Sequence, residues 1–203
     1  LRDGRILAIG AVADVPAKNS LSRHQLSARQ YPVLLVSKDQ ARTWSLPIRV
    51  VPSDQAKNWG GEEFDVAELA SGDLLCVYRR IDPASEKRNR EVRWQGLLKK
   101  DGDGFVPRRV GPAPFPHSGH PTLLATREGV VLHFATSGIH WTRDAGLTWN
   151  RLGVPGTHYY PDALQGSDGL ILVSAHVGGD NAYGSVDQAI MLDSFRLRVK
   201  PGK

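Results

Sequence analysis

Seven side chains that could bind or transform a ligand lie at the same sequence separations from glycines, each of which stands in a turn between two short apolar segments. Polar or aromatic residues stand nine and seven residues before these glycines, and an Arg or a His follows two of them by seven residues. The seven residues are Glu63, Asp65, Arg79, His120, Tyr160, Asp162 and His176. Carboxylates and imidazoles transfer protons, a phenol can act as a nucleophile, and a guanidinium binds anions. The pattern predicts that they surround one ligand-sized hollow, and hydrogen bonding to loops is the alternative for each residue.

Short β-strands are expected to position these residues. The sequence contains 21 glycines and 13 prolines, which interrupt helices and favour turns, and no apolar period of 3.6 persists over ten residues. Apolar runs of four or five residues, bounded by turn residues, are typical of strands. They predict strands at 5–9, 33–36, 74–78, 130–134, 170–174 and 189–192. The expected fold class is therefore all-β, with helix as a minor component.

A fourfold repeat organises these strands. An apolar strand, a turn ending in glycine and a second apolar strand recur around Gly4, Gly72, Gly129 and Gly169. Glycine suits such turns because it adopts positive φ without steric cost. The glycines are 40 to 68 residues apart, which is near the period of a blade in a β-propeller. We expect four repeats, at approximately 1–60, 61–115, 116–156 and 157–203.

A second motif reads Ser/Thr-x-Asp-x-Gly-x-Thr-Trp. It is complete at 142–149, and it recurs at 37–44 with Ala41 in place of the glycine. In such a turn the aspartate carboxylate accepts backbone N–H groups, the glycine takes a left-handed conformation, and the tryptophan packs against the sheet. Asp39 and Asp144 are therefore predicted to have a structural role rather than a catalytic one.

Composition excludes several other classes of protein. No stretch approaches eighteen consecutive apolar residues, so no membrane-spanning helix is expected. The net charge of +5 comes from scattered basic residues, which gives no support to nucleic-acid binding. Cys76, the single cysteine, lies in an apolar run and is predicted to be a buried, inert thiol. His120, His133 and His140 are spaced so that no two could be ligands within one strand, and no metal site is predicted.

The two Asp-containing turns resemble the Asp-box, or BNR repeat, of the sialidase superfamily. In exo-α-sialidases one blade reads Glu-x-x-x-x-Glu-Leu-x-x-Gly-x-Leu-Leu-x-x-x-Arg, and residues 63–79 of this sequence match that pattern. The resemblance implies that Glu63 is catalytic and that Arg79 binds the carboxylate of the substrate. Tyr160 matches the position of the family's nucleophile, although Pro161 follows it where the family has serine.

This resemblance implies a six-bladed β-propeller, of which the chain supplies about four blades, and a hydrolase that cleaves a terminal sugar of the sialic-acid type. A carboxylate nucleophile would be repelled by the carboxylate of sialic acid, whereas a phenol, with a pKa of about 10, needs a base beside it. Glu63 would accept the proton of Tyr160 as it attacks, which gives a covalent glycosyl-enzyme and retained configuration. Neither a metal nor an organic cofactor is needed. Further substrate-binding candidates are Asp65, His120, Asp162 and His176.

One departure from the family pattern leaves three functions open. The third arginine of the family's carboxylate clamp is expected within residues 134–142, which contain no arginine, and neutral sugars need no such clamp. The preferred hypothesis is a sialidase-like glycosidase. The alternatives are a non-catalytic propeller that binds glycans or a protein partner, and a structural propeller whose polar residues do not converge.

The first residues of the sequence bear on whether it is part of a longer protein. It begins in a turn-like segment with no signal-peptide pattern, so we expect a piece of a longer protein. The compartment is left open, and a secreted or periplasmic protein would fit the family. In the last repeat, Asp180 and Tyr183 are additional candidates for ligand contact.

Overall fold

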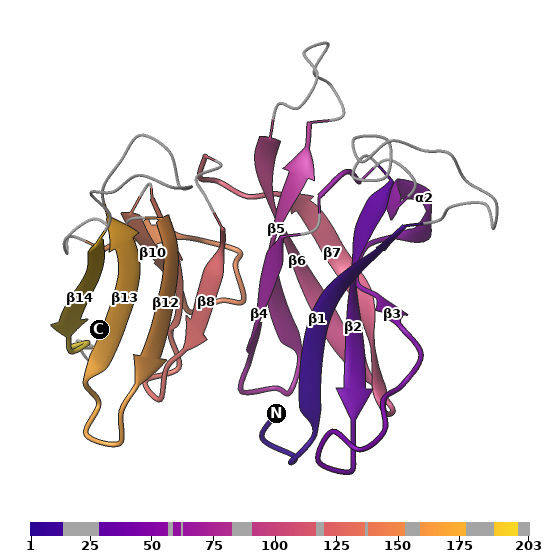
Figure 1. Cartoon of the computed structure of the whole chain (residues 1–203), viewed down its shortest axis with the longest axis horizontal. Helices are drawn as coiled ribbons and strands as arrows, with labels where there is room; N and C mark the ends of the chain where they lie inside the picture. Colours follow the sequence, from indigo (N-terminus) through magenta and orange to yellow (C-terminus); the bar gives the residue numbers. More distant parts are fainter. Residues whose placement is uncertain are drawn as a thin grey trace. The chain divides into compact units, whose positions relative to one another are not determined.

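The structure is a computed structural model. It describes residues 1–13, 29–56, 59–61, 63–82, 91–116, 120–136, 138–152, 159–177 and 189–198. The chain divides into two compact units, Leu1–His117 and Ser118–Lys203, each built from antiparallel sheets (Figure 1). Within the described ranges the only helix is one turn, α2 (Ser53–Ala56). The all-β class predicted from the sequence is confirmed.

The described residues of the first unit form two sheets. One has the order β1-β2-β3 and the other the order β4-β5-β6-β7, so strands that follow one another in sequence also lie side by side. This order is that of antiparallel strands joined by direct connections. The strands are β1 (Ile6–Ala13), β2 (Gln30–Ser37), β3 (Ile48–Arg49), β4 (Phe64–Glu68), β5 (Leu74–Ile81), β6 (Glu91–Asp101) and β7 (Gly104–Pro112).

Aromatic side chains form much of the core of the first unit. Trp59 is fully buried and makes edge-to-face contacts with Tyr78, at 5.3 Å between ring centroids, and with Trp94, at 5.7 Å. The Tyr78 hydroxyl donates a hydrogen bond of 2.9 Å to the carbonyl of Val50. Alternate residues of β5, such as Cys76 and Tyr78, point into this core. The residues between them therefore project from the opposite face of the sheet.

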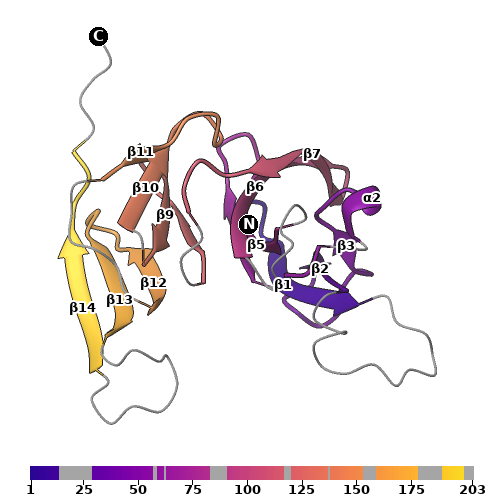
Figure 2. The same cartoon turned by 90° about the horizontal axis from the view of Figure 1, so that it is seen from above.

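In the second unit, too, the residues that the structure describes form two sheets. Their orders are β11-β10-β9-β8 and β12-β13-β14, and Figure 2 shows the three strands of the second sheet side by side. Leu132, Phe134 and Ile139 of one sheet pack with Ile171 and Val173 of the other in a single core. The strands are β8 (Thr122–Ala125), β9 (Val131–Ala135), β10 (Gly138–Thr142), β11 (Asn150–Arg151), β12 (Tyr159–Gln165), β13 (Ile171–Val177) and β14 (Ala189–Phe195).

The Asp-containing loop at 142–149 connects β10 to β11 and has the hydrogen bonds predicted for it. The carboxylate of Asp144 accepts the backbone N–H of Thr148 at 2.9 Å and its hydroxyl at 2.6 Å. Thr142 donates its hydroxyl to the same carboxylate at 2.7 Å and accepts the N–H of Gly146 at 3.0 Å. Gly146 has a φ of 77°, the left-handed conformation expected of it.

The loop at 37–44 connects β2 to β3 and repeats this geometry. Asp39 accepts the backbone N–H of Thr43 at 2.8 Å, and Ser37 accepts the N–H of Ala41 at 2.9 Å. Ala41 has a φ of 66°, so an alanine holds the left-handed conformation that the other loop gives to a glycine. Trp44 is 40% exposed, so the prediction that this tryptophan packs into the sheet is wrong.

Other local predictions can be compared with the structure. The four turn glycines all have positive φ, from 72° to 85°. Five of the six predicted strands begin within one residue of an observed strand, and the sixth, 33–36, lies inside β2, which starts three residues earlier at Gln30. Cys76 is fully buried, as predicted, and burial raises the pKa of its thiol to about 12. Strands β6 and β7 were not expected. No helix among the described residues is long and apolar enough to cross a membrane.

Candidate functional site

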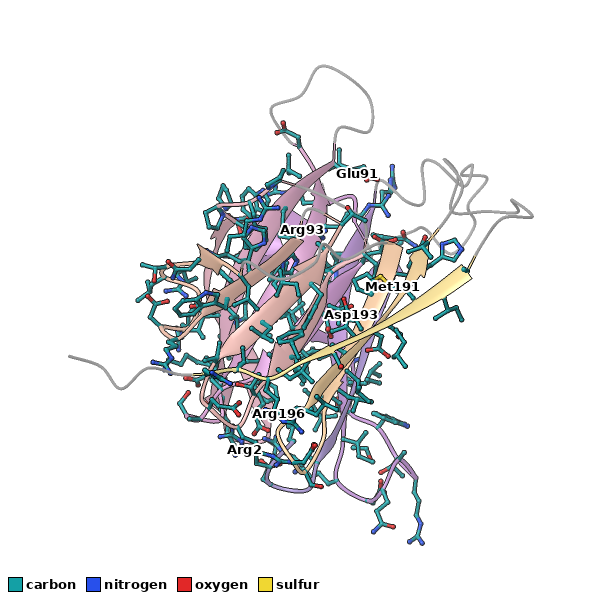
Figure 3. The ribbon with its side chains drawn as sticks, turned by 90° about the vertical axis from the view of Figure 1, so that its left-hand side faces the viewer. Arg2, Glu91, Arg93, Met191, Asp193 and Arg196 are labelled. Atoms are coloured by element: carbon teal, nitrogen blue, oxygen red, sulfur yellow. The ribbon has the colours of Figure 1, made fainter. Side chains whose placement is uncertain are left out.

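The first group of candidate residues lies in the first unit, in a row across three strands. Glu63 directly precedes β4, and its carbonyl accepts the backbone N–H of Arg79 at 2.8 Å. Arg79 on β5 is paired with Arg93 on β6. Directly opposed residues of antiparallel strands share a face of the sheet, so these three side chains project on the face opposite the aromatic core. Glu91 lies on this face too, two residues before Arg93 on β6 (Figure 3).

The Arg79 guanidinium binds two carboxylates in this group. Its Nη1 lies 2.9 Å from Oε1 of Glu63, and its Nη2 pairs with the carboxylate of Glu91. The side chains of Arg79, Glu63 and Glu91 are 25%, 20% and 26% exposed, so the group is accessible to a ligand yet partly shielded from water. Ion pairs in such surroundings are screened less than those on an open surface. We call Glu63, Arg79, Glu91 and Arg93 the ionic row.

Arg93 is the buried member of the ionic row, with only 2% of its surface exposed. Burial lowers the pKa of Arg93 to about 10, and the positive charge of Arg79 acts in the same direction, while Glu63 and Glu91 oppose the change. Arg93 therefore stays protonated at neutral pH. With two arginines and two glutamates, the ionic row combines equal numbers of cationic and acidic groups.

Asp65 lies one row nearer the turn between β4 and β5. It is paired with Val77 on β5, and its carboxylate accepts the backbone N–H of Val66 at 2.8 Å. Because Asp65 is two residues from Glu63 along the chain, it projects on the same face of the sheet. The structure thus brings three of the predicted site residues, Glu63, Asp65 and Arg79, to one end of one sheet.

The second group lies in the second unit, around a bulge in β12. Tyr159 is paired with His176 and Asp162 with Ser174, so the register shifts between them. A proline cannot donate a hydrogen bond to a neighbouring strand, and Pro161 therefore favours an irregularity at this place. Tyr160 has a φ of 47°, a left-handed conformation that is strained for any residue with a Cβ.

Tyr160 is 45% exposed, and its ring lies beside that of His120, with 6.3 Å between ring centroids. The carbonyl of Pro161 accepts a hydrogen bond of 2.5 Å from the hydroxyl of Thr122, which ties the bulge to β8. The bulge is therefore held by both sheets of this unit while it presents the phenol ring to solvent.

Asp162 and His176 flank the bulge on the sheet. Asp162 is exposed, and its carboxylate accepts the N–H of Ala163 at 2.8 Å. His176 is half-buried, and its Nδ1 is buried without a hydrogen-bond partner among the described residues. The structure thus brings Tyr160 and His120 together and places Asp162 and His176 on the neighbouring part of the same sheet.

Two further histidines of the second unit, His133 and His140, pack against their neighbours. His133 is fully buried, and its ring lies 6.1 Å from that of His140 and 6.3 Å from that of Trp149. Burial lowers the pKa of His140, and the nearby charge of Arg151 adds to this effect. In the part of the chain that the structure describes, no group of three or more His, Cys, Asp or Glu residues is arranged to hold a metal ion.

Two members of the ionic row, Glu91 and Arg93, were missed by the sequence reasoning. The signal was present: polar residues at 91, 93 and 95 alternate with Val92 and Trp94, the period of a half-buried strand. This alternation places both charged side chains on one face of β6. The candidates Asp180 and Tyr183 lie outside the described residues.

Comparison with solved structures shows the fold. The chain is similar to the GH93 alpha-L-arabinofuranosidase of Fusarium graminearum, solved with arabinobiose, with a TM-score of 0.68 and 14% identity over 96% of this chain and 55% of that enzyme. It is also similar to the NanB sialidase from Streptococcus pneumoniae, with a TM-score of 0.50 and 17% identity over 80% of this chain and 26% of the sialidase. No protein-family model matches the sequence, and no curated protein matches it.

At these identities the similarity concerns the fold. The predicted all-β propeller fold is confirmed by these neighbours together with the four antiparallel sheets found among the described residues. The chain spans about half the length of the arabinofuranosidase and about a quarter of the sialidase.

Proposed function

We propose that this chain is the sugar-binding and catalytic part of a β-propeller glycoside hydrolase. The observation that carries the proposal is the ionic row, in which Glu63 and Glu91 hold one partly exposed guanidinium at the end of a sheet. Carboxylates and guanidinium groups bind sugar hydroxyls through directed hydrogen bonds, and glycosidases use carboxylates for proton transfer. The arabinofuranosidase and the sialidase that share the fold are both glycosidases by name, which supports the same class for this chain.

Glu63 is the residue we assign to proton transfer. Its ion pair with Arg79 and the backbone hydrogen bond between the same two residues fix the carboxylate at the start of β4. Its 20% exposure leaves it accessible to a substrate. A fixed, accessible carboxylate is what general acid–base catalysis requires.

Tyr160 is the residue we assign as nucleophile. Its exposed ring and its strained backbone support this role, because strain of this kind is commonly found where a side chain must be held for function. The activation of Tyr160 by Glu63 is part of the proposal and comes from the sequence resemblance. The same resemblance, through the turns at 37–44 and 142–149, favours a member of the sialidase superfamily.

The test is hydrolysis of aryl glycosides by the full-length protein, with an aryl sialoside and an aryl α-L-arabinofuranoside as substrates. Glu63→Gln is expected to lower turnover by at least about 100-fold, the usual contribution of a general acid or base. Asp54→Asn, at an exposed acid of α2, is the control and should retain wild-type turnover. Turnover that Glu63→Gln leaves unchanged would reject the assignment, and binding of either sugar without any turnover would establish the non-catalytic glycan-binding alternative instead.

A further inference from the structure

We infer that Glu91 is a specificity-determining residue that keeps Arg79 occupied, so that the ionic row accepts an uncharged sugar and rejects an anionic one. This inference rests on the proposed function and names the substrate class of that site. It also assigns a role to a residue that the sequence reasoning did not single out.

Both terminal nitrogens of Arg79 already have carboxylate partners. A guanidinium recognises a carboxylate by presenting two N–H groups to its two oxygens. In this structure Nη1 of Arg79 pairs with Glu63 at 2.9 Å, and Nη2 pairs with Glu91. A substrate carboxylate would therefore have to share these nitrogens with, or displace, the glutamates that are already bound to them.

The other cation of the ionic row is buried. Arg93 carries a positive charge beside Glu63 and Glu91, but with 2% exposure its side chain is out of reach of a ligand in solvent. Arg79 is thus the accessible cation of the ionic row, and both of its terminal nitrogens are engaged.

The charges of the ionic row also disfavour an anionic ligand. Two glutamates balance two arginines in the ionic row, so an added carboxylate would give it a net negative charge in a place partly shielded from water. Repulsion between like charges is stronger there than in bulk water. An uncharged sugar avoids this cost, because its hydroxyl groups can donate to the glutamate oxygens and leave the ion pairs in place.

The experiment compares wild type with Glu91→Gln in the full-length protein, measuring binding by calorimetry. N-acetylneuraminic acid is the anionic probe and methyl α-L-arabinofuranoside the uncharged one. Glutamine keeps the shape of glutamate and removes its charge, so Arg79 becomes available. We expect the affinity for N-acetylneuraminic acid to rise at least about tenfold, with a smaller change for the uncharged sugar.

Glu68→Gln is the matched control. Glu68 lies on β4 of the same sheet, and its carboxylate accepts the backbone N–H of Arg2 at 2.7 Å rather than a bond from Arg79. This variant should bind both probes as wild type does. Equal thermal melting of the three proteins checks that they are folded.

The outcomes separate this inference from the proposed function. If Glu91→Gln gains no affinity for N-acetylneuraminic acid, or if the wild type binds it more tightly than the uncharged sugar, the role of Glu91 is refuted. The wild-type comparison holds even if the variant fails to fold. The hydrolysis assay with Glu63→Gln decides the proposed function independently, because it measures turnover rather than the selection between charged and uncharged sugars.

Discussion

The two Asp-containing loops offer a reciprocal test of how backbone conformation contributes to stability. Ala41 and Gly146 occupy equivalent positions, with φ of 66° and 77°, and each donates its N–H to the hydroxyl oxygen at the start of its loop. Ala41 is exposed, so its methyl group contributes little packing. We predict that Ala41→Gly stabilises the first unit and that Gly146→Ala destabilises the second.

The magnitude follows from two opposing contributions. A residue with a Cβ in the left-handed conformation costs about 1–2 kcal/mol relative to glycine. Glycine in turn makes the unfolded chain more flexible, which costs about 0.4–1 kcal/mol. For Ala41→Gly the difference is a gain of about 0.5–1 kcal/mol. For Gly146→Ala the loss is about the same from the backbone alone, and the buried position of Gly146 adds to it.

The assay is urea unfolding of the full-length protein, with amide hydrogen exchange to assign each change to its unit. Ala8→Gly is the control for Ala41→Gly, because Ala8 lies in the middle of β1 and glycine is unfavourable inside a strand. Ala8→Gly should therefore destabilise the same unit. The reasoning is refuted if Ala41→Gly lowers the free energy of unfolding as Ala8→Gly does, or if Gly146→Ala raises it.

Two further predictions concern Tyr160 and Asp144. Tyr160→Phe should abolish turnover without loss of stability, whereas Tyr160→Gly should abolish turnover and raise the free energy of unfolding by up to about 1 kcal/mol, because it relieves the strain at a φ of 47°. Kinetics and urea unfolding check both, and a large loss of stability in Tyr160→Gly would contradict them. The pKa of Asp144 is lowered to about 2: burial alone would raise it, but hydrogen bonds from Thr148 and Thr142 outweigh burial. A carboxyl with a lowered pKa stabilises the folded state above its unfolded pKa of about 4 and loses this effect as the pH falls toward 2. Thermal melting from pH 6 to pH 2 should therefore show a loss of about 1 kcal/mol, after allowance for solvent screening, that Asp144→Asn lacks. An equal loss in Asp144→Asn would assign it to other carboxyl groups.

Local physics made part of this fold predictable. The four turn glycines were identified because glycine adopts positive φ without steric cost. The apolar strands were identified because short runs of β-branched residues between turns are typical of β-strands. The Asp-containing loops were predictable because their hydrogen bonds join residues two to four positions apart. Each of these features depends on a few neighbouring residues, so the sequence contains the full cause.

The candidate site was predictable only in part, because its members come from different strands. Glu63 and Arg79 were identified because both flank one hairpin. Arg79, however, was expected to bind the carboxylate of a substrate. Its actual partners include Glu91, which belongs to a strand with no apolar run to mark it. The backbone strain at Tyr160 depends on the bulge at Pro161 and on the hydrogen bond from Thr122 to the Pro161 carbonyl. These two residues are 39 positions apart, so a local sequence pattern could not predict their contact.

Neither the ionic row nor the left-handed conformation of Tyr160 is expected to stabilise the folded protein. Burying Arg93 among two glutamates and a second arginine gains little over apolar residues of similar size, because desolvation offsets the attraction between the charges. A left-handed tyrosine costs about 1–2 kcal/mol that a glycine would avoid. Each unit already has an apolar core on the other face of its sheet or between its sheets, so neither feature is needed to specify the fold. Under the proposed function, the ionic row and the exposed ring of Tyr160 serve ligand chemistry rather than stability. Removing them is therefore expected to change binding and turnover far more than the free energy of unfolding.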